Sequence, residues 1–161
     1  MKYEEFHSWS INDPEGFWGE QAKLVHWNKP PQTIRDYSKP PFCKWFAGGE
    51  TNICYNAVDR HLAEHADKNA VIYISTETNE TVTYTYAELY REVNRFAALL
   101  QSLGVGKGDR VIIYMPMIAE AAFAMLACAR IGAIHSVVFG GFAAYNLAVR
   151  IDDAKPKVMV S

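Results

Sequence analysis

Short β-branched runs alternate with helical patterns throughout the last third of the chain. Strand-like runs occupy residues 110–115, 136–139 and 157–161, and helical patterns occupy residues 118–131 and 142–152. Strands that are joined through a helix by short connections usually run parallel, with a right-handed crossover. The sequence therefore predicts an α/β fold in which a β-α-β-α-β unit forms a parallel sheet.

The helical pattern at residues 118–131 is apolar almost all round, with Glu120 and Arg130 as its only charged residues. Such a helix must be covered on more than one side. A membrane span is disfavoured, because Gly132 ends the apolar run well short of the about 20 residues that a span requires. The strand at 157–161 has no turn after it. We therefore expect the sheet to continue, and the chain to be the N-terminal fragment of a larger protein.

A β-hairpin and a long amphipathic helix are predicted ahead of this unit. Thr85 is placed to cap the helix, with Glu88 three residues later as its capping-box partner, and Gly104 ends it. In chain order, the expected elements are a helix at 56–67 with Val58 and Leu62 on one face, hairpin arms at 70–75 and 81–86, and a helix whose apolar stripe is Leu89, Val93, Phe96, Leu100 and Leu103.

An aromatic and proline-rich segment opens the chain. All four tryptophans lie in it, together with the pairs Pro30–Pro31 and Pro40–Pro41. We expect a helix at residues 3–11 and a second one starting at Asp13-Pro14, since proline suits the first helical position. The segment that follows should be extended and broken by proline as far as Gly48-Gly49.

The aromatic side chains of this segment are expected to have few partners within it. We interpret the segment as a strap that covers the surface of a larger body; an aromatic platform for a peptide or a sugar is the alternative. The sequence thus predicts a strap at residues 1–55, followed by the first part of a larger domain at residues 56–161.

Composition excludes several classes of function. The formal net charge is −2, from 16 basic and 18 acidic residues, so the sequence predicts no basic face for nucleic acid. Three cysteines, Cys43, Cys54 and Cys128, lack C-x-x-C spacing and fit a reducing compartment. The acidic first residues do not resemble a signal peptide. We expect a cytoplasmic protein with no membrane partner.

Two motifs suggest chemistry that their context does not support. His61, Glu64 and His65 have the H-x-x-E-H spacing of one class of zinc peptidase, but no convincing third ligand is placed nearby. We expect no metal site and interpret this segment as a solvated helix face. The glycine-rich run from Gly104 to Asp109 lacks the G-K-[ST] of a phosphate loop, and it leaves a helix rather than opening one. It is predicted to be a helix C-cap and a tight turn.

Phe139, Gly140 and Gly141 lie where a ligand of an open α/β sheet would bind. They follow the carboxyl end of a predicted parallel strand and precede a helix. Glycine allows the backbone to approach a bulky ligand, and the N–H groups that begin a helix favour an anion. A plain strand-to-helix turn is the alternative, and Met115-Pro116 at the same edge has a weaker claim. No nucleophile and base are recognisable together in the sequence.

A series of motifs distributed over the whole chain resembles the opening of one enzyme family. The motifs are FW at residues 17–18, N-x-x-D-R-H-L at 56–62, YISTET at 73–78, Y-x-E-L at 86–89, LGV at 103–105, GDRV at 108–111, YMPM at 114–117, MLACARIGAIHSVVFGGF at 125–142 and RIDDAKP at 150–156. Together they are similar to the adenylate-forming enzymes, in their acetyl-CoA synthetase branch. The runs at 73–78 and 150–156 resemble the propionate–CoA ligases more than the acetate enzymes.

This resemblance implies a function for the parent protein. Enzymes of the branch join a short carboxylic acid such as propionate or acetate to CoA, using ATP and magnesium, through an acyl-adenylate that releases pyrophosphate. The resemblance also implies that Phe139, Gly140 and Gly141 lie against the CoA nucleotide. The phosphate loop, acyl pocket and catalytic lysine of the family are expected beyond residue 161. We therefore expect no catalytic residue in this chain, and no activity from the chain alone.

Two other functions remain open from the sequence. Within the family, the parent could be an acetate–CoA ligase, because the acyl pocket that would distinguish the acids is not expected in this stretch. Outside it, the chain could be a stand-alone α/β nucleotide-binding module. A dehydrogenase-like domain is disfavoured, since the chain lacks a G-x-G-x-x-G that leaves a strand and opens a helix.

Overall fold

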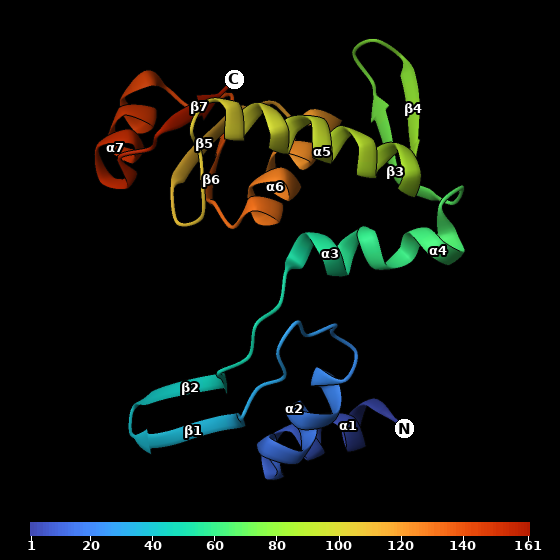
Figure 1. Ribbon diagram of the computed structural model, residues 1–161, viewed down its shortest axis with the longest axis vertical. Coiled ribbons are helices and arrows are strands. Elements are labelled where there is room, and N and C mark those ends of the chain that lie inside the picture. Colours follow the sequence, from blue (N-terminus) through green and yellow to red (C-terminus); the bar gives the residue numbers. More distant parts are fainter. The chain divides into compact units, whose positions relative to one another are not determined.

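The computed structural model describes all of residues 1–161 (Figure 1). The chain separates into two compact units, Met1–Asn52 and Ile53–Ser161, each of which has its own internal contacts. The first unit contains helices and one small sheet, and the second contains helices and two, so the predicted α/β class is confirmed. None of the helices is both long enough and apolar enough to span a membrane.

The first unit begins with two helices, α1 (Tyr3–Asn12) and α2 (Pro14–Ala22). The Asp13 carboxylate caps α2 by accepting a hydrogen bond of 3.0 Å from the Gly16 N–H. Pro14 occupies the first turn, where its missing N–H is no loss. Both predicted helices are thus confirmed, with the second beginning at the cap that the sequence indicated.

A β-hairpin replaces the extended, proline-broken segment that we expected after α2. Strands β1 (Thr33–Lys39) and β2 (Phe42–Ala47) pair antiparallel. The expectation was wrong because both proline pairs lie outside the strands. Pro30–Pro31 precedes β1, and Pro40–Pro41 forms the turn, so neither pair removes an N–H from the ladder.

Aromatic side chains of the first unit pack against one another. Phe17 is buried, and the rings of Phe6, Trp9 and Trp18 approach it edge-on at centroid distances of 4.7, 5.1 and 5.1 Å. Trp18 also contacts the Trp45 ring on β2. The expectation of few internal partners was therefore wrong, because the hairpin brings β2 back to the helices. That the segment covers a larger body remains a prediction.

The second unit starts with three short helical pieces instead of the single predicted helix at 56–67. They are α3 (Ile53–Ala57), the 3₁₀ helix η1 (Asp59–His61) and α4 (Leu62–His65). Val58 interrupts them with φ −125° and ψ −65°, and its side chain is completely buried. Packing of this β-branched side chain in the core thus overrides a continuous helix, for which valine has only modest propensity.

The predicted hairpin and its following helix are confirmed. Strands β3 (Asn69–Ser75) and β4 (Glu80–Thr85) pair antiparallel, and α5 (Tyr86–Ser102) follows at once. The capping box is complete: Glu88 N–H donates to the Thr85 hydroxyl at 3.2 Å, and the Glu88 carboxylate accepts from Thr85 N–H at 2.9 Å. Leu103, the last residue of the predicted stripe, is exposed, so the buried face ends one turn earlier than expected, at Leu100. Ala97, which the predicted stripe did not include, is also buried.

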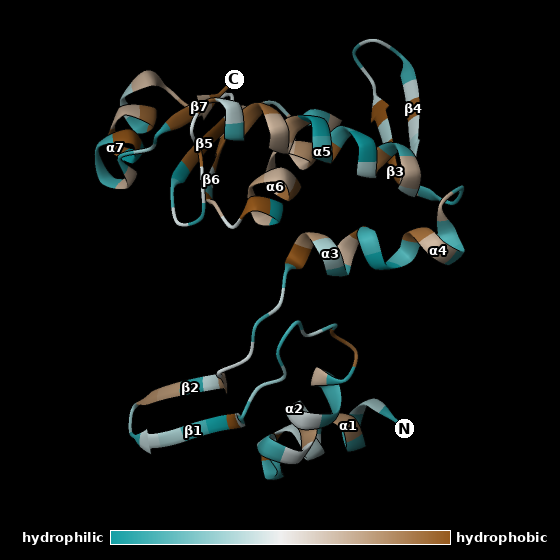
Figure 2. Cartoon of the chain, viewed as in Figure 1, coloured by the Kyte–Doolittle hydropathy of each residue, from teal (hydrophilic) through white to brown (hydrophobic).

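A parallel three-stranded sheet forms the centre of the second unit. Strand β5 (Arg110–Met115) lies between β6 (Ile134–Phe139) and β7 (Val158–Val160), and pairs parallel with both. The connections run through α6 (Ala119–Ile131) and α7 (Ala144–Ala154). The predicted β-α-β-α-β unit is therefore confirmed, and these strands are among the most hydrophobic parts of the chain in Figure 2.

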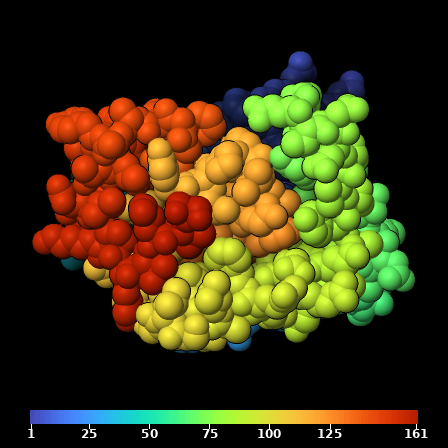
Figure 3. All heavy atoms as spheres, turned by 90° about the horizontal axis from the view of Figure 1, so that it is seen from above, coloured from blue at the N-terminus to red at the C-terminus, as the bar shows by residue number.

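The nearly all-apolar helix α6 is covered on several sides, as its sequence predicted. It packs against α5, α3, β5 and β6, and Figure 3 shows α5 and α6 side by side in yellow-green and orange. Its buried residues belong to the same core as the fully buried Val111 and Ile113 of β5. This core fixes the end of β5, and therefore the edge of the sheet at which the candidate site lies.

Candidate functional site

The turn from Phe139 to Phe142 leaves the carboxyl end of β6 beside the carboxyl end of β5. Phe139 pairs with Met115 in the parallel register, and Gly140 N–H donates to the Met115 carbonyl at 3.2 Å. Helix α7 starts two residues later than predicted, at Ala144, because residues 140–143 form the turn itself. The sheet thus places the three predicted residues at the edge where ligands of open α/β sheets bind.

The two glycines of this turn have different steric surroundings. A Cβ on Gly140 would lie 3.2 Å from the Pro116 nitrogen and 3.3 Å from the Met115 carbonyl carbon. A Cβ on Gly141 would lie 2.7 Å from the Phe139 ring. Neither glycine has a positive φ. Space rather than backbone conformation therefore explains both residues: Gly140 faces the backbone of β5, and Gly141 lies under an aromatic ring.

Aromatic surface is exposed on both sides of the glycines. The Phe139 and Phe142 side chains are 54% and 43% exposed, and their rings stand at 89° with centroids 6.2 Å apart. The Arg150 guanidinium lies 5.2 Å from the centre of the Phe142 ring and donates to the Asn146 carbonyl. An exposed aromatic pair beside a cation is suited to a planar ligand that carries negative charge.

Tyr114 is a residue of this edge that the sequence analysis missed. Its hydroxyl lies 3.0 Å from the Gly140 carbonyl and 3.0 Å from the Phe142 carbonyl, so it bridges the turn from β5. The one signal in the sequence is a phenol in a strand that is otherwise aliphatic from Val111 to Met115. Only the pairing of β5 with β6 shows what this hydroxyl contacts.

The H-x-x-E-H motif does not form a compact ligand set. His61 lies in η1 and His65 in α4, with their rings stacked at a centroid distance of 6.3 Å. The His61 Nε2 atom is 3.1 Å from the Asn56 carbonyl oxygen. No group of three or more His, Cys, Asp or Glu side chains in residues 1–161 could hold a metal ion.

The glycine-rich run from Gly104 to Asp109 is a helix C-cap and turn, as predicted. Gly104 and Gly108 have φ of +82° and +84°, which glycine adopts readily. The Asp109 carboxylate accepts hydrogen bonds from Gly106 N–H at 2.8 Å and from the Lys157 ammonium at 3.0 Å. These bonds hold the pKa of Asp109 below its usual value. The run therefore connects α5 to β5 and is tied to Lys157, the residue before β7; Lys107 is not a phosphate-loop lysine.

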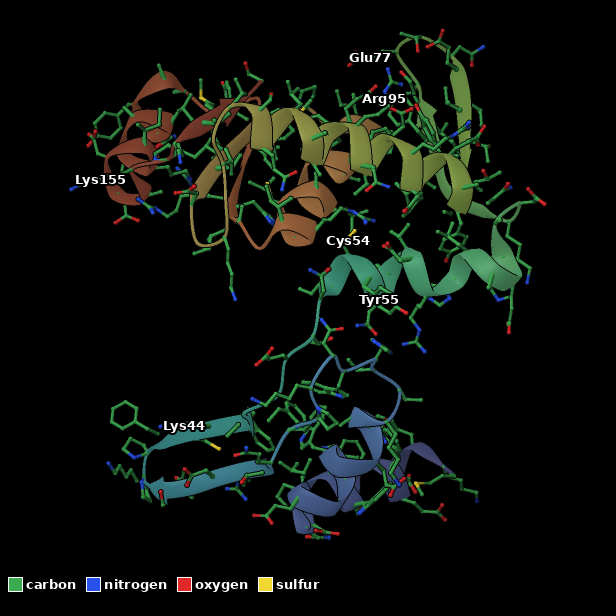
Figure 4. The ribbon with its side chains drawn as sticks, in the orientation of Figure 1. Lys44, Cys54, Tyr55, Glu77, Arg95 and Lys155 are labelled. Carbon is green, nitrogen blue, oxygen red and sulfur yellow. The ribbon has the colours of Figure 1, made fainter.

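None of the cysteines forms a disulfide. Burial raises the pKa of Cys128 to about 11, and also raises the pKa of Cys54, which lies on the side of α3 that faces α6 (Figure 4). Thiols of this kind stay protonated and are poor nucleophiles. The structure thus provides no cysteine nucleophile in the second unit.

An ion pair that the sequence analysis did not identify lies beside Cys54. Arg130 donates to both carboxylate oxygens of Asp59, at 3.0 and 2.7 Å, and its guanidinium lies 5.1 Å from the centre of the Tyr90 ring. Both charged side chains are about one-fifth exposed. The pair links η1 to the end of α6, far along the sequence, and is a structural contact rather than part of the candidate site.

Two family models together match almost all of the chain. Residues 58–161 match the family described as AMP-binding enzyme, and residues 3–57 match the acetyl-coenzyme A synthetase N-terminus. The two matches meet between Ala57 and Val58, whereas the compact units meet between Asn52 and Ile53. The predicted division at residues 55 and 56 lies between these two boundaries and remains a prediction.

Individual relatives match over the full length of the chain. It is 56% identical to propionate–CoA ligase of Salmonella typhimurium, covering 100% of this chain and 26% of that protein. It is 47% identical to acetyl-coenzyme A synthetase of Yersinia pestis, covering 99% and 25%. The fold matches acetoacetyl-CoA synthetase from Streptomyces lividans with a TM-score of 0.90 at 32% identity, covering 99% and 25%.

The chain therefore spans about a quarter of the length of these relatives. The matched region includes the sheet edge and the turn described above, in the part that the AMP-binding model covers. Since that model matches most of the chain and the fold agrees with a solved synthetase, the chain belongs to the AMP-binding enzyme family, with an N-terminus of the acetyl-coenzyme A synthetase type.

Proposed function

We propose that this chain forms the N-terminal part of a short-chain acyl-CoA synthetase that joins propionate to CoA. The observation that carries the proposal is the identity of 56% over the whole chain to a propionate–CoA ligase, against 47% to an acetyl-coenzyme A synthetase. In the proposed reaction the carboxylate attacks the α-phosphorus of ATP and releases pyrophosphate. The CoA thiol then attacks the acyl carbon and releases AMP, giving the thioester.

Within this reaction, we assign the turn at Phe139, Gly140 and Gly141 to the nucleotide part of CoA. Three observations support the assignment: the turn lies at the carboxyl edge of the parallel sheet, its aromatic rings are partly exposed, and the missing side chain at Gly141 lets the Phe139 ring lie against the turn. In addition, no side chain caps the first turn of α7, and no acidic residue lies there. Its N–H groups are therefore compatible with an anionic ligand.

No catalytic role is assigned to residues 1–161. The magnesium ion that the family resemblance implies would need oxygen ligands, and the described residues contain no cluster of three potential metal-binding side chains. This part of the chain does not fit that ion, so no step of the reaction is derived through it. The cytoplasmic location expected from the sequence remains a prediction.

The assignment of the turn is tested with the Gly141→Ala variant of the full-length enzyme. The new methyl group would lie 2.7 Å from the Phe139 ring and push this exposed ring into the space assigned to the nucleotide. We expect the KM for CoA to rise roughly 5- to 100-fold, the range that moderate overpacking represents. Exchange of labelled pyrophosphate into ATP with propionate measures the first step without CoA, and should change much less.

Gly106→Ala is the matched control, because a Cβ there meets only the Asp109 carboxylate at 3.9 Å, and Gly106 lies before β5 rather than after β6. If Gly141→Ala changes both half-reactions equally in a folded protein, the turn has only a structural role. Comparing propionate with acetate in the exchange assay tests the substrate separately. A preference for acetate would contradict the proposed acid while leaving the CoA assignment unaffected.

A further inference from the structure

The hydroxyl of Tyr114 is the polar group of β5 that reaches the candidate turn. Tyr114 is partly exposed and lies one residue before the end of the strand. Its oxygen is 3.0 Å from two carbonyl oxygens, those of Gly140 and Phe142, which flank Gly141 on both sides. This contact joins residues 26 and 28 positions apart in the sequence, so it depends on the pairing of β5 with β6.

The chemistry of a phenol explains why this contact fixes the shape of the turn. A hydroxyl has one proton, so at any moment it donates to one of the two carbonyls and stays next to the other. The turn is otherwise held by two backbone bonds, from Gly140 N–H to the Met115 carbonyl and from Phe142 N–H to the Phe139 carbonyl. The first bond holds the start of the turn to β5, and the second closes the turn on itself. Among the hydrogen bonds of the turn, those of the phenol are the ones that tie its far end to β5.

Holding both ends of the turn also determines where its aromatic rings stand. Phe139 precedes the first bridged carbonyl, and Phe142 carries the second. Their rings are perpendicular, at a centroid distance of 6.2 Å, and both are about half exposed. A change in the distance between the two carbonyls would therefore change the surface that the rings present.

We propose that Tyr114 is a positioning residue for CoA: its hydroxyl holds the turn at residues 139–142 in the shape that receives the nucleotide. This inference rests on the function proposed above, and assigns Tyr114 a role that acts through the shape of the turn. A phenylalanine would fill the same volume in β5, so the hydroxyl is the part of the side chain that serves the turn.

The Tyr114→Phe variant of the full-length enzyme tests the role of the hydroxyl. We expect the KM for CoA to rise roughly 3- to 10-fold, which is the factor that one ordinary hydrogen bond represents. The exchange of pyrophosphate into ATP is the reference, and should change by less than the KM for CoA. Tyr73→Phe is the matched control, because Tyr73 lies on β3, in a different sheet, and packs against the same core.

A double-mutant cycle with Gly141→Ala separates this inference from the proposed function. Because both residues act on one turn, the effect of Tyr114→Phe on the KM for CoA should be smaller when Gly141 is already alanine. If Gly141→Ala raises the KM for CoA and Tyr114→Phe does not, the turn binds CoA but the positioning role is wrong. If neither variant changes it, the site assignment itself fails.

Two further outcomes would also overturn the inference. Equal losses in both half-reactions, or additive effects in the cycle, would mean that the hydroxyl supports the fold in general rather than this turn. Should Tyr114→Phe fold poorly at the assay temperature, both half-reactions are measured at a lower temperature at which the variant is folded. An unchanged KM for CoA under those conditions would assign the hydroxyl to stability alone.

Discussion

Replacing Gly140 by alanine tests whether the close approach of the turn to β5 is required for the stability of the sheet. The added Cβ would lie 3.2 Å from the Pro116 nitrogen, 3.3 Å from the Met115 carbonyl carbon and 3.5 Å from the Met115 oxygen. All three atoms belong to the backbone at the end of β5, so no side-chain rotation relieves the contact. Either β5 shifts, or the hydrogen bond from Gly140 N–H to Met115 lengthens.

The size of the effect follows from these distances. Distances of 3.2 to 3.3 Å are a few tenths of an ångström shorter than an ordinary carbon contact, and the neighbours are fixed. Overpacking of this kind typically costs about 1–3 kcal/mol. Partial loss of one backbone hydrogen bond lies within the same range. Gly141→Ala is the comparison, because the atoms nearest its Cβ belong to the half-exposed side chain of Phe139 rather than to the backbone; its cost should stay below about 1 kcal/mol.

Amide hydrogen exchange is the appropriate assay, because it reads the stability of one strand. Peptides from residues 1–52 serve as an internal control, because these residues form a separate compact unit. In Gly140→Ala, peptides from β5 should exchange roughly 5- to 150-fold faster, which corresponds to about 1–3 kcal/mol of lost stability. The exchange of peptides from residues 1–52 should not change.

Two results would refute this reasoning. Unchanged exchange in β5 of Gly140→Ala would mean that the turn relaxes without disturbing the strand, so that close approach is not the reason for glycine. Equal acceleration in Gly140→Ala and Gly141→Ala would mean that the distinction between a backbone neighbour and a side-chain neighbour does not hold at this edge.

Two further predictions concern α5. Leu100→Ala should lower the free energy of unfolding by about 2–4 kcal/mol, because Leu100 is only 1% exposed. Leu99 is 53% exposed, so Leu99→Ala should lower it by less than about 1 kcal/mol. Urea unfolding of both variants checks this, and similar losses in the two would contradict it. The backbone N–H of Thr85, and then its hydroxyl, lower the pKa of Glu88. The resulting stabilisation of the folded state should therefore be present above the unfolded-state pKa of roughly 4.3, and be lost as the pH falls through the lower folded-state pKa. Glu88→Gln should remove this acid dependence. An unchanged pH profile of stability in Glu88→Gln would argue against a role of the Glu88 carboxylate.

Local signals were sufficient for two elements of the second unit, β5 and α5. Strand β5 was predicted to the residue because an aliphatic run stands between the Gly108-Asp109 turn and Pro116. Helix α5 was predicted at its start because Thr85 and Glu88 form their cap within a single turn. Each of these signals involves residues that are close in sequence, so no tertiary contact is needed to read them.

Local signals failed where burial or pairing across the chain decides the conformation. The helix predicted at 56–67 is interrupted because Val58 enters the core, and the hairpin of β1 and β2 depends on pairing that proline content alone obscured. In both cases the competing local conformations differ by little free energy, so packing and strand pairing determine the outcome.

For the candidate site, the sequence alone determined which three residues stand at the end of β6 and that two of them lack side chains. It did not determine the reason for each glycine, nor the role of Tyr114. The contacts that decide these points join residues 26 and 28 positions apart, and the Asp59–Arg130 pair joins residues 71 apart. Such contacts leave no periodic or local pattern in the sequence, because they exist only after the strands have paired and the helices have packed.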